Sequence, residues 1–103
     1  MQAVLTIQFE WDERKNAANI AKHGFDFADA DRIFNAPLLV DPDEPTDYGE
    51  DRWIGIGLLD GRVIVVVFIE PADNTIRVIS LRKALSHERR RYEHYLQNRL
   101  GQN

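Results

Sequence analysis

The sequence has 103 residues, no cysteine and a formal net charge of −4 at pH 7, and its 44% hydrophobic and 29% charged residues are the balance of a folded globular protein. This length excludes two independent hydrophobic cores, so we expect one domain over residues 1–103, and the absence of cysteine excludes disulfides, thiolate metal sites and a cysteine nucleophile. The longest apolar run, Val63 to Ile69, is too short to cross a membrane, and no signal-peptide pattern opens the chain, so we expect a cytoplasmic protein with no membrane partner.

The start of the chain predicts a strand and then a helix. Apolar residues alternate with polar ones, as in a strand with one buried face, at Leu5, Ile7, Phe9 and Trp11. Asp12 is suited to cap the following helix and Gly24 to end it. We expect this helix to bury its apolar stripe, which consists of Ala17, Ile20 and Ala21.

A second, shorter helix is expected between Asp26, its cap, and Pro37, which ends it. Its apolar side consists of Phe27, Ala30, Ile33 and Phe34. Residues 38–40 predict a short edge strand, and the acidic segment 41–49, with two prolines, predicts a loop.

The second half predicts a three-strand antiparallel meander and a C-terminal helix. The strands are expected at 52–59, 62–69 and 75–81, with Asp60-Gly61 as a two-residue hairpin turn and 71–74 as the second turn. Ser86 is suited to cap a helix that runs to about Leu100, with a buried side made of Tyr92, Leu96 and Leu100. The sequence therefore predicts an α+β fold: a small antiparallel sheet, made of the meander and the N-terminal strand, with two N-terminal helices and one C-terminal helix.

Charge is unevenly distributed along the chain. Residues 41–51 carry six acids and no basic residue, whereas residues 82–91 carry five basic residues and one acid. We expect a molecule with a basic end and an acidic loop. The negative total argues against indiscriminate binding of nucleic acid, which needs clustered positive charge.

Three arginines are candidates for holding phosphate: Arg52, Arg77 and Arg82. A guanidinium binds phosphate oxygens in a bidentate manner. For Arg52 and Arg77, an ion pair with a nearby acid explains the residue equally well. In an ideal strand Ser80 and Arg82 share one face, and Arg77 points to the other.

The polar face of the first helix carries Lys15, Lys22 and His23. It is either a solvated face or a cationic surface that receives phosphate, and His23 at the helix end suits the helix dipole as well as it suits catalysis. Arg89, in the basic run of the last helix, likewise belongs to a solvated face or to a surface that guides RNA or a partner. No Gly-rich phosphate loop and no metal-ligand spacing occurs, so we expect no metal and no cofactor.

Several segments, in their order and spacing, resemble the BrnT family of toxins. They are Phe9 to Asp12, Lys15-Asn16, Asn19, Lys22 to Gly24, Phe27 to Ala30 with Phe34, Gly49 to Ile54, Ile56-Gly57, Arg77 to Ser80, Arg82 to Ala84, and Glu88-Arg89 with Tyr92. The likeness covers about residues 8–95. Two segments depart from the family pattern: a Thr-Glu-Arg-like stretch is replaced by Ile69-Glu70-Pro71, and Ser-Ala-Arg by Ser80-Leu81-Arg82.

This resemblance implies a RelE-like fold and a metal-independent ribonuclease toxin of a type II toxin–antitoxin pair, which arrests growth by cutting RNA. It also implies a neutralising BrnA-like antitoxin with a ribbon-helix-helix domain, through which alone the complex would bind operator DNA. In such a mechanism the ribose 2′-hydroxyl attacks the adjacent phosphorus, and the enzyme supplies a base, an acid and charge stabilisation.

For that reaction we assign charge stabilisation to Arg52, Arg77 and Arg82, and proton transfer to Glu50 or His23. The substrate-binding candidates are Lys15, Lys22, Ser80 and Arg89. The alternative is a non-catalytic protein-binding module of the same fold, in which the arginines bind an acidic partner. The negative charge and the altered 69–71 segment favour this alternative.

Overall fold

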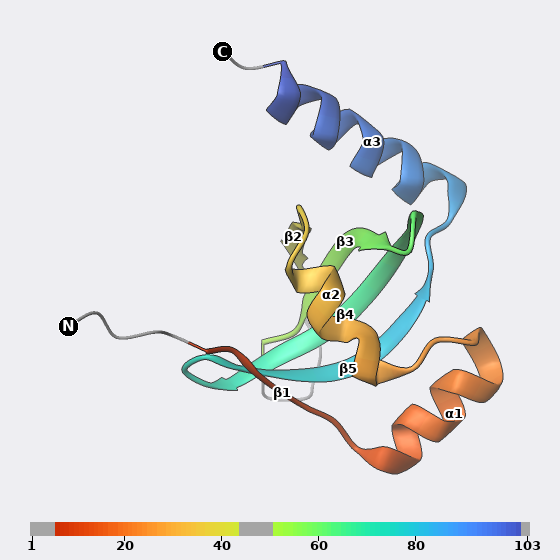
Figure 1. The fold of residues 1–103 in the computed structure, drawn as a ribbon, viewed down its shortest axis with the longest axis vertical. Helices are drawn as coiled ribbons and strands as arrows, with labels where there is room; N and C mark the ends of the chain where they lie inside the picture. Colours follow the sequence, from red (N-terminus) through yellow and green to blue (C-terminus); the bar gives the residue numbers. More distant parts are fainter. Residues whose placement is uncertain (1–5, 44–50, 102–103) are drawn as a thin grey trace.

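The computed structural model describes residues 6–43 and 51–101 of the chain. Within them the elements are β1 (Gln8–Glu10), α1 (Glu13–His23), a 3₁₀ turn η1 (Phe27–Asp29), α2 (Ala30–Phe34), β2 (Leu39–Pro42), β3 (Trp53–Leu59), β4 (Arg62–Ala72), β5 (Thr75–Lys83) and α3 (Ser86–Leu100). These elements confirm the predicted α+β class, and Figure 1 shows the helices placed around one twisted sheet.

The strands form one sheet in the order β1-β5-β4-β3-β2. The predicted antiparallel meander of β3, β4 and β5 is present, but β1 pairs with β5 in parallel, so the sheet is mixed. Asp60 and Gly61 both have positive φ, as the Asp-Gly hairpin turn requires. The second turn is shorter than predicted: β4 continues through Pro71 to Ala72, and only Asp73 and Asn74 separate it from β5.

Each face of the sheet carries its own apolar cluster. One cluster joins η1 and α2 to the sheet, through buried residues such as Phe27, Ile33 and Phe68. The other joins α3 to the opposite face, where Tyr92 packs with Ile56 and Val65. Because side chains alternate along a strand, any residue of β3, β4 or β5 can be assigned to the α2 side or the α3 side of the sheet.

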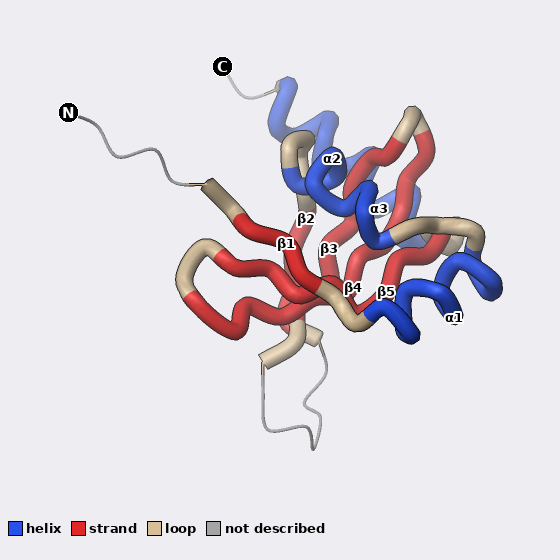
Figure 2. Tube along the Cα trace, turned by 60° about the horizontal axis from the view of Figure 1, so that its bottom comes forward, coloured by secondary structure: helices blue, strands red, loops and turns tan. Residues whose placement is uncertain are grey.

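The position of α1 corrects the sequence prediction. Figures 1 and 2 show α1 beside the edge of the sheet at β5, rather than over a face of it. Its buried residues are Asn16 and Asn19, whereas Ile20 is 41% exposed and Ala17 and Ala21 are also exposed. The helix therefore packs through its polar side, because Asn19 satisfies backbone groups at the sheet edge and Asn16 satisfies the Phe27 N–H of η1, which alanines cannot do.

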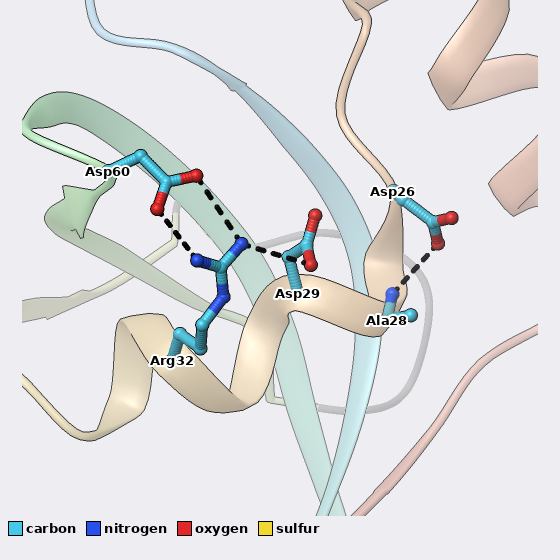
Figure 3. A network of polar contacts seen from close by, with 5 residues as sticks. All are labelled: Asp26, Ala28, Asp29, Arg32 and Asp60. Atoms are coloured by element: carbon cyan, nitrogen blue, oxygen red, sulfur yellow. Dashed lines mark hydrogen bonds and ion pairs between the residues drawn. The ribbon is translucent and has the colours of Figure 1, made fainter.

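An ion-pair network joins α2 to the β3–β4 hairpin, as Figure 3 shows. Arg32 lies 2.6 Å from an oxygen of Asp60 and 3.1 Å from an oxygen of Asp29. Asp26 caps η1 by accepting the Ala28 N–H, and this bond, with one from the Asn16 amide, lowers the pKa of Asp26. These contacts hold the connection between α1 and β2 over the α2 side of the sheet.

Three polar contacts tie α3 to the sheet side. The Tyr92 hydroxyl donates to the carbonyl of Pro37 at 2.7 Å, Arg91 lies 2.5 Å from Asp41 of β2, and Glu88 pairs with Arg82 of β5. The expected burial of Leu100 is wrong: its side chain is 83% exposed, since the end of α3 extends away from the sheet (Figure 1).

Candidate functional site

A β-bulge places three of the predicted site residues on one face of the sheet. Val78 pairs with Phe68 and Ser80 pairs with Val67, so Ile79 is an extra residue of β5 without an opposite partner. The alternation of β5 side chains between the two faces of the sheet therefore shifts by one residue at Ile79. Val78 and Leu81, three residues apart, both belong to the α2-side cluster, and Arg77, Ser80 and Arg82 lie together on the α3 side.

The bulge overturns the expectation that Arg77 and Arg82 point to opposite faces. That expectation assumed an ideal strand, and nothing in the sequence around Ile79 marks the extra residue. The cross-strand partners agree with the observed arrangement: Arg77 pairs with Ile69, Ser80 with Val67 and Arg82 with Val65, which packs under α3. We call the surface formed by Arg77, Ser80 and Arg82 with these three partners the arginine face.

Arg82 is held at one end of the arginine face by Glu88. Its two terminal nitrogens donate to the two carboxylate oxygens at 2.8 and 2.9 Å. Glu88 also accepts the backbone N–H of Leu85 at 2.8 Å, which fixes the start of α3. The pair with Arg82 lowers the pKa of Glu88, so the carboxylate stays charged, while the Nε–H of Arg82 lies outside the pair.

Arg77, at the other end, pairs with Glu10 of β1. Its Nε donates to Glu10 Oε2 at 2.6 Å, and its terminal nitrogen lies 2.5 Å from the same oxygen. An ion pair with an acid on a neighbouring strand was one of the two interpretations that the sequence left open. The parallel register, which sets Glu10 beside Arg77, produces it.

Arg52 precedes β3 and is half-buried. Its carbonyl accepts the Asp43 N–H at 2.8 Å, which continues the pairing of β2 with β3. Alternation places Arg52 on the α3 side with Ile54, in line with Ile69 and Arg77 across the sheet. Its predicted partner Glu50 lies outside the described residues.

Lys15 joins the site from α1. It lines a cavity of about 320 Å³ together with Arg77, Glu10, Trp11 and Asp12. Lys22 follows two helical turns later, so it projects from the same side of α1 as Lys15. The two lysines flank Asn19, whose amide contacts the backbone of Leu81 on β5.

The two remaining candidates stand on the helices beside the sheet and not on the arginine face itself. His23 is half-buried in the last turn of α1, eight residues and therefore about 12 Å along the helix from Lys15. Arg89 is exposed in the first turns of α3, next to Glu88. The structure thus places Arg77, Ser80 and Arg82 on one face, with Lys15 beside Arg77. His23 lies one helical turn beyond Asn19, which contacts Leu81.

The sequence reasoning missed two acids that organise the site, Glu10 and Glu88. Glu88 had a detectable signal, because an acid in the first turn of a helix can accept the N–H of the residue that caps it. That residue is Leu85, three positions before Glu88, and not Ser86 as predicted. Glu10 had none, since its role depends on the parallel pairing of β1 with β5. In the described part of the chain, no three His, Asp or Glu side chains are grouped to hold a metal ion, and none of the helices is long and apolar enough to span a membrane.

Comparison with known proteins identifies the family to which this chain belongs. Residues 11–88 match the model of the family described as ribonuclease toxin, BrnT, of type II toxin–antitoxin system. The crystal structure of the Brucella abortus ribonuclease toxin BrnT is 37% identical, with a TM-score of 0.60, and the match covers 79% of this chain and all of that one. No curated protein matches the sequence. Because the family model covers most of the chain and the solved relative is similar over its whole length, the protein belongs to the BrnT family of ribonuclease toxins of type II toxin–antitoxin systems.

Proposed function

We propose that this protein is an endoribonuclease that cleaves RNA at the arginine face without a metal ion, by attack of a ribose 2′-hydroxyl on the adjacent phosphorus. The attack breaks the bond from that phosphorus to the 5′-oxygen of the next nucleotide, which takes up a proton as it leaves. The observation that carries the proposal is the bulge at Ile79, which puts Arg77, Ser80 and Arg82 on one face of the sheet. A strand of RNA laid along β5 would meet two guanidinium groups and, between them, a hydroxyl.

The spacing of the two arginines suggests that they contact different phosphates. Four residues lie between Arg77 and Arg82, and their partners Ile69 and Val65 are four positions apart on β4, about 13 Å along the sheet. The two arginines would therefore not enclose one phosphodiester. We assign charge stabilisation at the scissile phosphate to Arg82 with Ser80, and contact with a neighbouring phosphate to Arg77. Arg52, Lys15, Lys22 and Arg89 would position the rest of the strand.

Arg82 suits the central role because Glu88 holds it rigidly. Glu88 occupies the two terminal nitrogens and leaves the Nε edge for a phosphate oxygen. A guanidinium fixed before the substrate arrives needs little reorganisation in the transition state. The proton acceptor is proposed to be Glu50 or His23.

The biological setting follows from family membership. A type II toxin has an antitoxin partner and an RNA substrate. We propose that the antitoxin is a BrnA-like protein with a ribbon-helix-helix domain, that it neutralises this toxin in the cytoplasm, and that operator DNA is bound only through it.

The test is cleavage of a single-stranded RNA in the presence of EDTA by the wild type and three variants. Arg82→Ala should lower the cleavage rate roughly 10²–10³-fold, as the loss of one charge-stabilising donor does, and Arg77→Ala should lower it less. Arg99→Ala is the control, because Arg99 is exposed near the end of α3 and contacts Tyr95. Unchanged rates in both Arg82→Ala and Arg77→Ala would refute the assignment.

The rival function is a non-catalytic protein-binding module, and one observation favours it. Both Arg77 and Arg82 already have a carboxylate partner in the folded protein. Growth on induction separates the two: the toxin should arrest cells, and Arg82→Ala should not. If the wild type leaves growth and RNA intact, the binding module is the better description.

A further inference from the structure

We propose that the cavity lined by Trp11, Lys15 and Arg77 is a nucleotide subsite, in which an unpaired RNA base stacks on Trp11 and its phosphate meets the two cations. This inference rests on the proposed function, since it assigns one position of the RNA strand that the arginine face would hold. It also adds a residue, Trp11, that no argument from the sequence placed in the site.

Trp11 has the properties of a rigid stacking surface. Its side chain is half-buried and packs against the α2-side core, and its indole Nε1–H donates to Glu13 at 2.8 Å. The same residue lines the cavity of about 320 Å³. An aromatic ring that is held on one side and reaches a cavity on another binds a base with little loss of side-chain freedom.

The acids of the cavity are engaged in contacts of their own. Asp12 caps α1, accepting the N–H groups of Arg14 and Lys15 at 2.8 and 3.1 Å. Glu10 pairs with Arg77 through Nε and one terminal nitrogen, and the other terminal nitrogen lies outside that pair. Lys15 is exposed. A phosphate entering the cavity therefore finds an ammonium and one guanidinium edge.

The charges of the cavity select among ligands. Two cations and two carboxylates sum to zero, so the cavity does not attract polyanions in general, and stacking must supply most of the affinity. Stacking on a side chain requires a base that is not paired in a duplex. The ligand class is therefore a single strand rather than a duplex, and the proposed function makes that strand RNA.

Arg77 connects the subsite to the arginine face, because it belongs to both. A base on Trp11 would place its own phosphate at Arg77, and the strand would continue along β5 toward Ser80 and Arg82. The subsite would fix which phosphodiester reaches Arg82. Loss of Trp11 should therefore weaken binding and also loosen the choice of cleavage position.

The experiment titrates a single-stranded 2′-O-methyl RNA hexamer, which has no free 2′-hydroxyl and cannot be cleaved by the proposed route. In a Trp53→Phe background Trp11 is the sole tryptophan of the chain, and its fluorescence should be quenched on binding. In calorimetric titrations, which need no tryptophan, Trp11→Leu should raise the Kd roughly 5- to 100-fold, as the loss of one stacked base does, and Trp11→Tyr should restore most of the affinity. A duplex of the same sequence should bind more weakly.

Lys15→Ala is a second variant, at an exposed position where the substitution should leave the fold intact. It should weaken binding of the hexamer several-fold. Arg99→Ala, with the same loss of one charge, is its control and should bind like the wild type. Unquenched Trp11, or affinities unchanged in both Trp11→Leu and Lys15→Ala, would overturn the subsite. If the hexamer binds through Trp11 but unmodified RNA is never cleaved, the subsite is supported and the ribonuclease assignment is refuted. If unmodified RNA is cleaved equally well by the wild type, Trp11→Leu and Lys15→Ala, the ribonuclease assignment is supported and the subsite is refuted.

Discussion

The side-chain amide of Asn19 hydrogen-bonds both backbone groups of Leu81, donating to its carbonyl at 3.0 Å and accepting its N–H at 3.2 Å. β1 pairs with β5 only as far as Arg77, so beyond that point this amide takes the place of a neighbouring strand. The contact explains why α1 lies at the edge of the sheet and where its lysines stand relative to β5.

Asn19→Ala should destabilise the protein strongly. The substitution leaves the Leu81 N–H and carbonyl and the Phe25 carbonyl without the amide that now satisfies them. Each buried group without a partner costs roughly 1–3 kcal/mol, and solvent entry would reduce the sum. Urea unfolding measures the change. Asn98→Ala, at an exposed position of α3, is the matched control, and equal midpoints for the two variants would contradict the prediction.

Glu88 should make the stability of the protein fall in acid. Its pKa is lowered from the ordinary value of 4.5, chiefly by the hydrogen bonds from Arg82. The stabilisation is therefore complete above pH 4.5 and is lost as the pH falls through the lowered pKa. The pKa of Asp26 is also lowered, so Asp26 makes the stability fall in acid as well. The effect of Glu88 is therefore read from the difference in unfolding midpoint between the wild type and Glu88→Gln.

Unfolding midpoints of these two proteins between pH 7 and pH 3 test this, with Glu93→Gln, at an exposed position of the same helix, as the control. The gap between wild type and Glu88→Gln should narrow in acid. A gap that stays constant over the whole range would show that the carboxylate charge does not stabilise the fold.

Tyr92→Phe should cost about 0.5–1.5 kcal/mol, since it removes the hydrogen bond to the Pro37 carbonyl and keeps the ring that fills the α3-side core. Burial raises the pKa of Tyr92 above its ordinary value of 10.0. The folded state thus favours the neutral phenol, and wild-type stability should fall as the pH rises past 10. Thermal unfolding at pH 8 and above pH 10 measures both effects, with Tyr95→Phe as the control. Between these pH values Tyr92→Phe should lose less stability than Tyr95→Phe, and equal losses would contradict the assignment to Tyr92.

Gly57→Ala should destabilise the contact between β3 and α2. A Cβ at this position would lie 2.9 Å from Leu38 Cδ1 and 3.1 Å from Ile33 Cγ2, and Ile33 is fully buried. Overpacking of this kind costs about 1–3 kcal/mol. In a Leu38→Ala background the same substitution should cost less, because the nearest atom is gone. Additive costs in the double variant would show that Leu38 is not the obstacle.

Local signals in the sequence predicted the elements well. Asp12 and Gly24 bound α1 as predicted, the Asp60-Gly61 turn forms the hairpin, and the fully apolar run from Val63 is the central strand β4. Each of these features depends on backbone preferences of a few adjacent residues, or on burial of both faces of a strand, and these are properties that a short stretch of sequence carries.

Pairing between distant segments is what the sequence left undetermined. The same spacing on α1 allows either stripe to be buried. The polar stripe is buried because Asn19 bonds to Leu81 at the edge of β5 and Asn16 bonds to Asp26 and Phe27 at η1. Alternation cannot reveal an extra residue such as Ile79, so only the register of β5 against β4 shows that Arg77 and Arg82 share a face. The chemistry of a side chain is a local property, but its direction and its partner depend on contacts between segments far apart in the chain. The sequence by itself therefore determined which residues could act on phosphate. The tertiary structure decided which of them lie on the same face.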